Sequence, residues 1–213
     1  MSAPDCIRRV VLWRWTDGAT DTQRLRAKEG LAYISYASEV DAVDFGEDIG
    51  IWGESNYGLV LARDHRDKQS WDNYNHDPHH YRVGNYIDTL THEKMTARAD
   101  YLYDGPPSVR GRIRHIELHC WRRDVASSQK EEACRQLVAL RGQCDSLLWL
   151  ATAYDLGWAA SGRADLIVEA HFLTESDART YFEHPAQRDA SALLSSLTIP
   201  ERTAQLQHYM RRG

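Results

Sequence analysis

The sequence lacks several features that mark common classes of protein. Its four cysteines form no CxxC pair and no zinc-finger spacing, so neither a structural zinc site nor a disulfide framework is predicted. No run approaches the roughly 20 apolar residues that a membrane-spanning helix needs. The formal net charge of -5 argues against nucleic acid as a partner, because binding to phosphates needs a dense basic surface.

The first 13 residues, MSAPDCIRRVVLW, also lack the apolar core of a secretion signal. We therefore expect a cytoplasmic protein whose cysteines stay reduced and pack as small apolar side chains. Of the 213 residues, 42% are hydrophobic and 27% charged, which is typical of a folded protein. This length suits one large domain or two small ones.

The chain contains an internal repeat. Residues 7–15 read IRRVVLWRW, and residues 113–121 read IRHIELHCW, 106 positions later. Residues 74–78 read YNHDP, and residues 181–185 read YFEHP, 107 positions later. The halves end in the alternating segments ARADYLYDG and AQLQHYMRRG. Three landmarks in the same order, at nearly one spacing, predict two homologous halves.

Both halves have the same predicted order of elements. In the first half we expect strands at residues 6–15, 40–47, 57–63 and 93–103, a helix at residues 21–36, and a helical stretch that Pro78 interrupts. In the second half we expect strands from residue 112, at 147–154, at 165–172 and up to residue 210, a helix at 127–142, and helices around Pro185.

This β-α-β-β-α-β order predicts an α+β fold made of two ferredoxin-like repeats, each a four-stranded antiparallel sheet with helices on one face. We place the repeats at residues 1–104 and 112–213, joined by a linker at residues 105–111. The second face of each sheet must also be covered. We therefore expect the two sheets to close into a pseudo-dimeric barrel, either in a monomer or in a homodimer.

The IRRVVLW…DGAT start and the YNHDPHH motif resemble the stress-responsive dimeric A/B barrel (Dabb) family, here in a tandem two-repeat form. The resemblance extends over nearly the whole chain, once per half. The family includes a plant polyketide cyclase and plant hydroxynitrile lyases. In its cyclase-type members a tyrosine and a histidine act as acid/base partners on a substrate in the barrel cavity.

The resemblance implies that Tyr74 and His80 form this pair in the first half. The matching positions of the second half hold Tyr181 and Gln187, and an amide cannot exchange a proton near neutral pH. A first-strand histidine of the cyclase corresponds to Arg9 in the first half and to His115 in the second. Its third-strand histidine corresponds to Gly58 and Asp165, so the resemblance does not fix the reaction.

Polar side chains alternate along two strands of the second half. Alternation places His115, Glu117, His119 and Trp121 on one face of the first strand, and Glu169 and His171 on one face of the third strand. These strands are neighbours in a ferredoxin-like sheet, so we expect a polar cluster in the cavity between the sheets, made of Glu117, His119, Glu169 and His171. Such a cluster suits proton transfer, a salt-bridged lining, or zinc, iron or manganese.

The leading hypothesis is a cofactor-independent acid/base enzyme of cyclase, lyase or isomerase type, acting on an aromatic or polyketide-like small molecule in the barrel cavity. The expected catalytic residues are His80, Tyr74, His119 and His171. The expected substrate-binding residues include tryptophans that offer flat surfaces to a ring: Trp13, Trp15, Arg9, His115, Glu117, Trp121, Glu169 and Tyr181.

We expect no cofactor, and a small molecule rather than nucleic acid or a membrane as the partner. Two alternatives stay open. One is an oxygenase or ring-cleaving enzyme, either cofactor-free or dependent on a metal held by the polar cluster. The other is a stress-related protein that binds a small molecule without catalysis.

Overall fold

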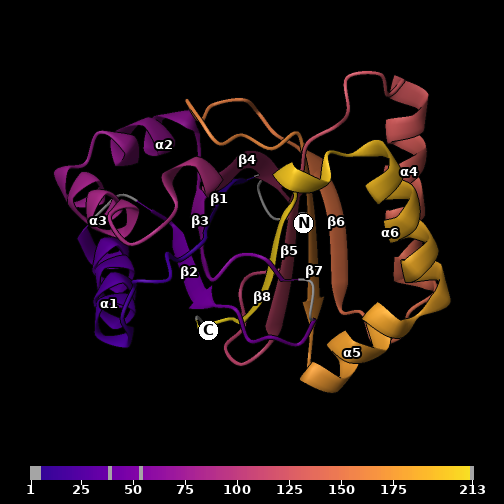
Figure 1. The fold of residues 1–213 in the computed structure, drawn as a ribbon, viewed down its shortest axis with the longest axis horizontal. Helices are drawn as coiled ribbons and strands as arrows, with labels where there is room; N and C mark the ends of the chain where they lie inside the picture. Colours follow the sequence, from indigo (N-terminus) through magenta and orange to yellow (C-terminus); the bar gives the residue numbers. More distant parts are fainter. Residues whose placement is uncertain (1–5, 38–39, 53–54, 212–213) are drawn as a thin grey trace.

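The computed structural model describes residues 6–37, 40–52 and 55–211 (Figure 1). The elements of the first repeat are β1 (Cys6–Trp13), α1 (Asp21–Ala37), β2 (Ala42–Glu47), β3 (Leu59–His65), α2 (Lys68–Asn75), α3 (Pro78–Asp88) and β4 (Ala97–Tyr103). Those of the second repeat are β5 (Ile113–His119), α4 (Ser127–Ala139), β6 (Trp149–Tyr154), β7 (Leu166–Phe172), α5 (Glu175–Glu183), α6 (Pro185–Leu197) and β8 (Ala204–Tyr209).

The two repeats have the same topology. Each has one four-stranded antiparallel sheet, ordered β2-β3-β1-β4 in the first repeat and β6-β7-β5-β8 in the second. The prediction of an α+β fold with two ferredoxin-like repeats is therefore confirmed. The linker at residues 105–111 stays a prediction. Residues 1–5 of the predicted first repeat and residues 212–213, the last two of AQLQHYMRRG, lie outside the described residues. No helix within the described ranges is long and apolar enough to cross a membrane.

The break at Pro78 separates two short helices. Helix α2 ends at Asn75, and α3 begins with Pro78 in its first turn, where the missing backbone N–H costs nothing. The side chain of Asp77 accepts a hydrogen bond from the backbone N–H of His79 at 2.7 Å and so caps α3. This break brings the last turn of α2 next to the first turn of α3.

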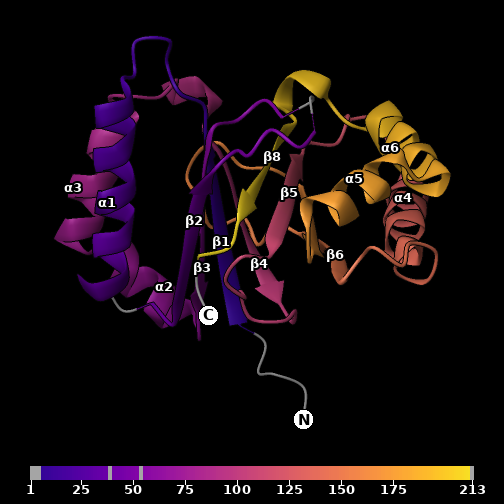
Figure 2. The same ribbon diagram turned by 90° about the horizontal axis from the view of Figure 1, so that it is seen from below.

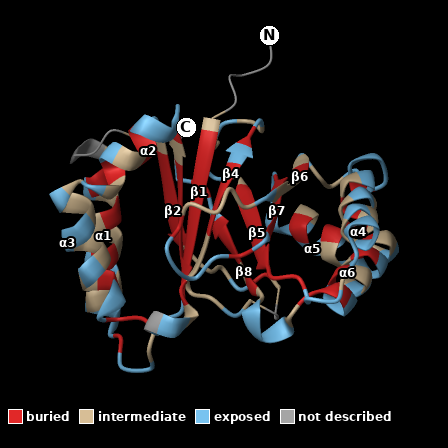
Figure 3. Ribbon diagram, turned by 90° about the horizontal axis from the view of Figure 1, so that it is seen from above, coloured by how far each residue is buried: buried red, intermediate tan, exposed pale blue. Residues whose placement is uncertain are grey.

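The two sheets face each other, and helices cover their outer faces (Figures 1 and 2). In Figure 3 the strands are mainly buried, whereas the helices expose their outer sides. Alternate residues of the central strands meet between the sheets in one apolar cluster, which includes Val10, Leu12, Ile116 and Leu118. The sequence expectation of two sheets packed on one another thus holds, with the helices outermost.

The expected hollow between the sheets is largely filled, which corrects the prediction of a shared cavity there. At one end of the interface Glu169 lies between two buried arginines, 2.8 Å from Arg8 Nη1 and 2.8 Å from Arg114 Nε. A cavity of about 200 Å³ remains at the edge between β4 and β6, where Tyr101 also contacts Glu169. Apolar packing and ion pairs occupy the space in which a ligand was expected.

Each repeat sends one loop onto the other. In the first repeat, residues on the C-terminal side of β2 contact β8, where the Ile49 N–H donates to the Gln207 carbonyl at 2.9 Å. The loop at residues 155–165, which we call the crossing arm, pairs with β4, where the Arg98 N–H donates to the Gly162 carbonyl at 2.7 Å. In Figure 1 this arm is the orange loop that reaches toward α2. The second repeat therefore helps to cover the first.

Candidate functional site

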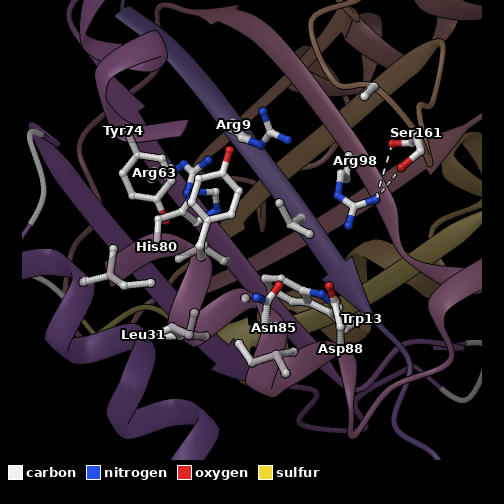
Figure 4. Close-up of a pocket in the computed structure, with 18 residues that line it drawn as sticks. Arg9, Trp13, Leu31, Arg63, Tyr74, His80, Asn85, Asp88, Arg98 and Ser161 are labelled. Atoms are coloured by element: carbon white, nitrogen blue, oxygen red, sulfur yellow. Dashed lines mark hydrogen bonds between the residues drawn. The ribbon is translucent and has the colours of Figure 1, made fainter. Parts of the chain in front are cut away.

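A cavity of about 280 Å³ lies between the outer face of the first sheet and helices α1 and α3 (Figure 4). Strand, helix and arm residues line it: Arg9, Val11, Trp13, Leu31, Ile34, Leu61, Arg63, Tyr74, His80, Tyr81, Val83, Gly84, Asn85, Ile87, Asp88, Arg98, Ala160 and Ser161. The exposed side chains of Tyr81, Asn85 and Asp88 lie on α3, and those of Ala160 and Ser161 on the crossing arm. We call this space the first-repeat cavity, and both repeats contribute to its wall.

The structure brings Tyr74 and His80 together in this cavity. Their ring centroids are 4.3 Å apart, with Tyr74 near the end of α2 and His80 in the first turn of α3. Neither the Tyr74 hydroxyl nor the His80 Nδ1 has a hydrogen-bond partner among the described residues, although both atoms are buried. A bound molecule could satisfy both atoms.

Burial and neighbouring charge set the protonation of this pair. Burial raises the pKa of Tyr74, so its hydroxyl keeps its proton at neutral pH. Burial, followed by the positive charges of Arg63 and Arg9, lowers the pKa of His80 to about 3, so its imidazole is neutral at pH 7. The pair therefore offers one hydroxyl donor and one imidazole that can accept a proton.

Arg63 is a cavity residue that the sequence interpretation missed. It lies in β3 with 1% of its surface exposed, and its guanidinium carbon is 3.4 Å from the centroid of the Tyr74 ring. The alternation of β3 offered a signal, because it places Arg63 on the same face as Leu59 and Leu61. A charge on an otherwise apolar, helix-facing side of a strand indicates a special role.

Two of the predicted binding residues line the same cavity. Trp13 and Arg9 project from β1, and Arg9 Nη1 is 3.4 Å from the Asp100 carboxylate. That carboxylate also accepts a hydrogen bond from the Trp71 indole at 2.7 Å. Trp15 does not reach this cavity and instead borders an open depression on the surface.

The predicted polar cluster of the second half is divided between the two faces of the second sheet. In the register of β5 and β7, Ile116 is directly opposite Glu169, whereas Glu117 is opposite Val168. Residues opposite each other share a face, so Glu169 points toward the first sheet with Ile116 and Glu117 points toward the helices. The expectation that Glu117, His119, Glu169 and His171 converge is therefore wrong.

Glu117 is the centre of a buried chain of hydrogen bonds. Its two oxygens accept from His115 Nε2 at 2.6 Å and from His119 Nε2 at 2.7 Å. Although burial opposes ionisation, these hydrogen bonds hold the pKa of Glu117 well below its usual range. Glu117 and His119 line a separate cavity of about 210 Å³ beside α6, which Trp52 of the first repeat also borders.

Glu169 and His171 belong to the packed interface between the sheets. The imidazole Nε2 of His171 is 2.7 Å from Glu169, and burial lowers the pKa of His171 to about 4. Because the two carboxylate–histidine pairs are on opposite faces, they cannot share one metal ion. Among the described residues, no group of three or more histidine, cysteine, aspartate or glutamate side chains is placed to hold a metal ion.

The second repeat does not reproduce the Tyr74/His80 arrangement. Tyr181 is buried in α5, with its ring centroid 5.2 Å from that of Phe172. Gln187 replaces the histidine, and its amide donates a hydrogen bond to Ser191 Oγ at 2.8 Å. Trp121 is 8% exposed and packs in the apolar core under α4 and α6, away from the first-repeat cavity. Among the residues that the structure describes, the pairing of a tyrosine ring with a histidine at a cavity is thus found in the first repeat and not at the matching positions of the second.

Two ferredoxin-like repeats, packed sheet to sheet with a cavity on the helix side, define a pseudo-dimeric α+β barrel. Residues 7–100 match the model of the stress responsive A/B barrel domain family, Dabb. This match assigns the first repeat to the Dabb family.

Similar solved structures extend over the whole chain. A crystal structure of an anthrone oxidase-like protein is 11% identical, covers 98% of this chain and 92% of its own, and has a TM-score of 0.73. A candidate monooxygenase from Fusobacterium nucleatum subsp. nucleatum is 9% identical over 99% and 93% of the two chains, with a TM-score of 0.60. At these identities the likeness shows the fold.

A hydroxynitrile lyase from Passiflora edulis is similar to one repeat. It is 15% identical, covers 51% of this chain and 98% of its own, and has a TM-score of 0.44. A search of curated proteins found no match.

Proposed function

We propose that the protein is a cofactor-independent acid/base enzyme of cyclase, lyase or isomerase type, acting on an aromatic or polyketide-like small molecule in the first-repeat cavity. One observation carries the proposal: the Tyr74 and His80 rings lie 4.3 Å apart at a cavity, each with a buried polar atom that has no partner among the described residues. The match of residues 7–100, which include both rings, to the Dabb family model supports it.

The two side chains would share the work of proton transfer. His80, neutral at pH 7, takes a proton from an acidic carbon next to a carbonyl group through Nδ1. The Tyr74 hydroxyl donates a hydrogen bond to the carbonyl oxygen, where negative charge develops as the proton leaves. His80 then returns the proton to the product, so no cofactor is consumed.

Some of the remaining predicted residues line the first-repeat cavity, and others lie elsewhere in the fold. Arg9 and Trp13 would contact the substrate directly, because they line the same cavity. His119 faces its own smaller cavity, and His171 is held between the sheets. We therefore assign His119 and His171 no step in the proposed reaction.

The proposal is tested with a panel of aryl diketo acids, beginning with 5-phenyl-3,5-dioxopentanoate, incubated without added cofactor and followed by liquid chromatography and mass spectrometry. Replacing His80 with alanine should lower turnover by about 10²- to 10⁴-fold, the usual contribution of a positioned acid or base. Tyr74→Phe should lower it by a smaller factor. His79→Ala is the matched control, since it changes a neighbouring histidine of α3 that does not line the cavity.

Full turnover by His80→Ala would remove this histidine from the mechanism.

An oxygenase is the second candidate function. Trp13 in the cavity wall suits an electron-rich ring, and the similar structures named above include an anthrone oxidase-like protein. Oxygen consumed in proportion to product would favour that reading. Tight binding of the acids with no product at any concentration would instead favour a non-catalytic binding protein.

A further inference from the structure

Arg63 is buried and lacks an ion pair within the described part of the chain, although the nearby Asp100 carboxylate acts on its charge. Its Nε and Nη2 atoms have no hydrogen-bond partner among the described residues, and no described carboxylate forms an ion pair with it. The sheet interface shows how this protein treats other buried arginines. Arg8 is bound to Asp64 and Glu169, and Arg114, equally buried, is also bound to two carboxylates.

The guanidinium of Arg63 keeps its charge at neutral pH. Burial lowers its pKa to about 9, which still leaves it a cation at pH 7. An unpaired buried charge is costly unless another group compensates it. The contact with the Tyr74 ring covers one face of the guanidinium but leaves Nε and Nη2 without acceptors among the described residues.

The surroundings of Arg63 add to the positive charge. Arg9 projects from the adjacent strand, directly opposite Arg63 in the register, and its Nε also lacks a partner among the described residues. The carboxylate of Asp100 contacts Arg9 only at 3.4 and 3.5 Å and is shared with Trp71. The inner end of the cavity thus holds two guanidinium groups and one shared carboxylate.

The rest of the cavity is suited to an apolar ring system. Val11, Leu31, Ile34, Leu61 and Trp13 provide apolar walls. Its volume of about 280 Å³ is nearly twice that of an engineered cavity of about 150 Å³ that binds benzene. A molecule of about two fused rings therefore fits the space.

We propose that the first-repeat cavity recognises a carboxylate: its substrate is an aromatic or polyketide-like acid of about two rings, whose anionic group binds the N–H donors of Arg63, with Arg9 beside it. The inference rests on the proposed function and names its substrate class. The second repeat offers no equivalent site, because Ala170 is opposite His115 where Arg63 is opposite Arg9.

The test compares two probes of equal size, 2-naphthoate and its neutral analogue 2-naphthamide, by titration calorimetry on the full chain. The wild-type protein should bind the acid about 10- to 100-fold more tightly, as expected for hydrogen bonds to a charged group. Arg63→Gln should reduce this preference to near unity, and Arg63→Lys should retain part of it. Arg82→Gln, an exposed arginine of α3, is the control for net charge and should leave the preference unchanged.

An unchanged preference in Arg63→Gln, or failure of the wild-type protein to prefer the acid, would overturn the inference. A second measurement does not depend on any variant: NMR titration of the His80 imidazole with each probe bound. The positive charges of Arg63 and Arg9 contribute to the lowered pKa of His80, while Asp77 acts in the opposite direction. Bound naphthoate should therefore raise this pKa and naphthamide should not; equal values with both probes would also overturn the inference.

The two proposals can fail separately. His80→Ala should keep the preference for naphthoate, because this histidine is not the anion-binding group. A clear preference for the acid together with no turnover of any aryl diketo acid would refute the proposed function and support the carboxylate site. Turnover of an aryl diketo acid without a preference for naphthoate would support the proposed function and refute the carboxylate site.

Discussion

Replacing Arg63 with methionine should stabilise the ligand-free protein. Burial lowers the pKa of Arg63 from its ordinary value to about 9, which corresponds to a cost of about 5 kcal/mol for keeping the charge. Its contact with the Tyr74 ring offsets about 2 kcal/mol, and fitting a methionine into the same space costs about 1 kcal/mol. The expected net gain in the free energy of unfolding is about 2 kcal/mol.

Urea unfolding at pH 7.5 measures this gain. The slope of the free energy of unfolding against urea concentration should be the same in the variant and the wild-type protein. The midpoint of thermal unfolding should rise by about 4–8 °C for a chain of this size. Arg8→Met is the matched comparison, because Arg8 is as buried as Arg63 but is bound to Asp64 and Glu169. That substitution leaves the buried Glu169 and the half-buried Asp64 each short of one partner and should cost about 3–5 kcal/mol.

The contrast between the two variants is the informative result. If Arg63→Met loses stability as Arg8→Met does, then Arg63 is a structural residue whose cation is already compensated within the fold. The argument for a ligand-binding cation would then be wrong. If Arg63→Met raises the free energy of unfolding and Arg8→Met lowers it, then the chain retains Arg63 at a cost to its own stability.

Three further predictions follow from the buried groups and the crossing arm. Glu169→Gln should lower the free energy of urea unfolding by about 3 kcal/mol, since it removes the anion between two arginines, whereas exposed Glu131→Gln should change it by less than about 0.5 kcal/mol. Burial lowers the pKa of His65 to about 3, so protons bind the unfolded chain first and stability falls as the pH drops from about 6.5 toward 3. In His65→Gln that fall, measured by urea unfolding at pH 7 and pH 5, should be smaller by about 2 kcal/mol, because each pH unit below about 6.5 contributes about 1.4 kcal/mol; an equal fall in both proteins would contradict it. Gly162→Ala should weaken binding of 2-naphthoate, because Gly162 has a φ of 67° and a Cβ there would lie 2.2 Å from the Thr96 carbonyl oxygen, which displaces the arm; unchanged affinity would show that the arm does not shape the cavity.

The element order could be predicted from the sequence pattern, whereas the pairing of Tyr74 with His80 was implied by the resemblance to the Dabb family. The internal repeat indicated the same element order in both halves, and Pro78 indicated the boundary between two helices. A tyrosine in the last turn of one helix and a histidine in the first turn of the next are close in space because the break is only two residues long. Local geometry alone therefore brings these two rings together.

The assignment of faces could not be predicted in the same way. Alternation shows that His115, Glu117 and His119 share a side of their strand, but not whether this side meets helices or the other sheet. The register of Ile116 opposite Glu169 depends on the lengths of loops and on packing between distant segments. For the same reason the sequence did not predict that the crossing arm would help to close the first-repeat cavity.

The most direct test of the central claim is a crystal structure of the protein with 2-naphthoate bound. We predict the naphthalene rings against Trp13 and Val11 in the first-repeat cavity, with the carboxylate within hydrogen-bond distance of the Arg63 guanidinium and next to Tyr74 and His80. Binding beside Glu117 and His119, or at the edge between β4 and β6 with the first-repeat cavity left empty, would contradict the account.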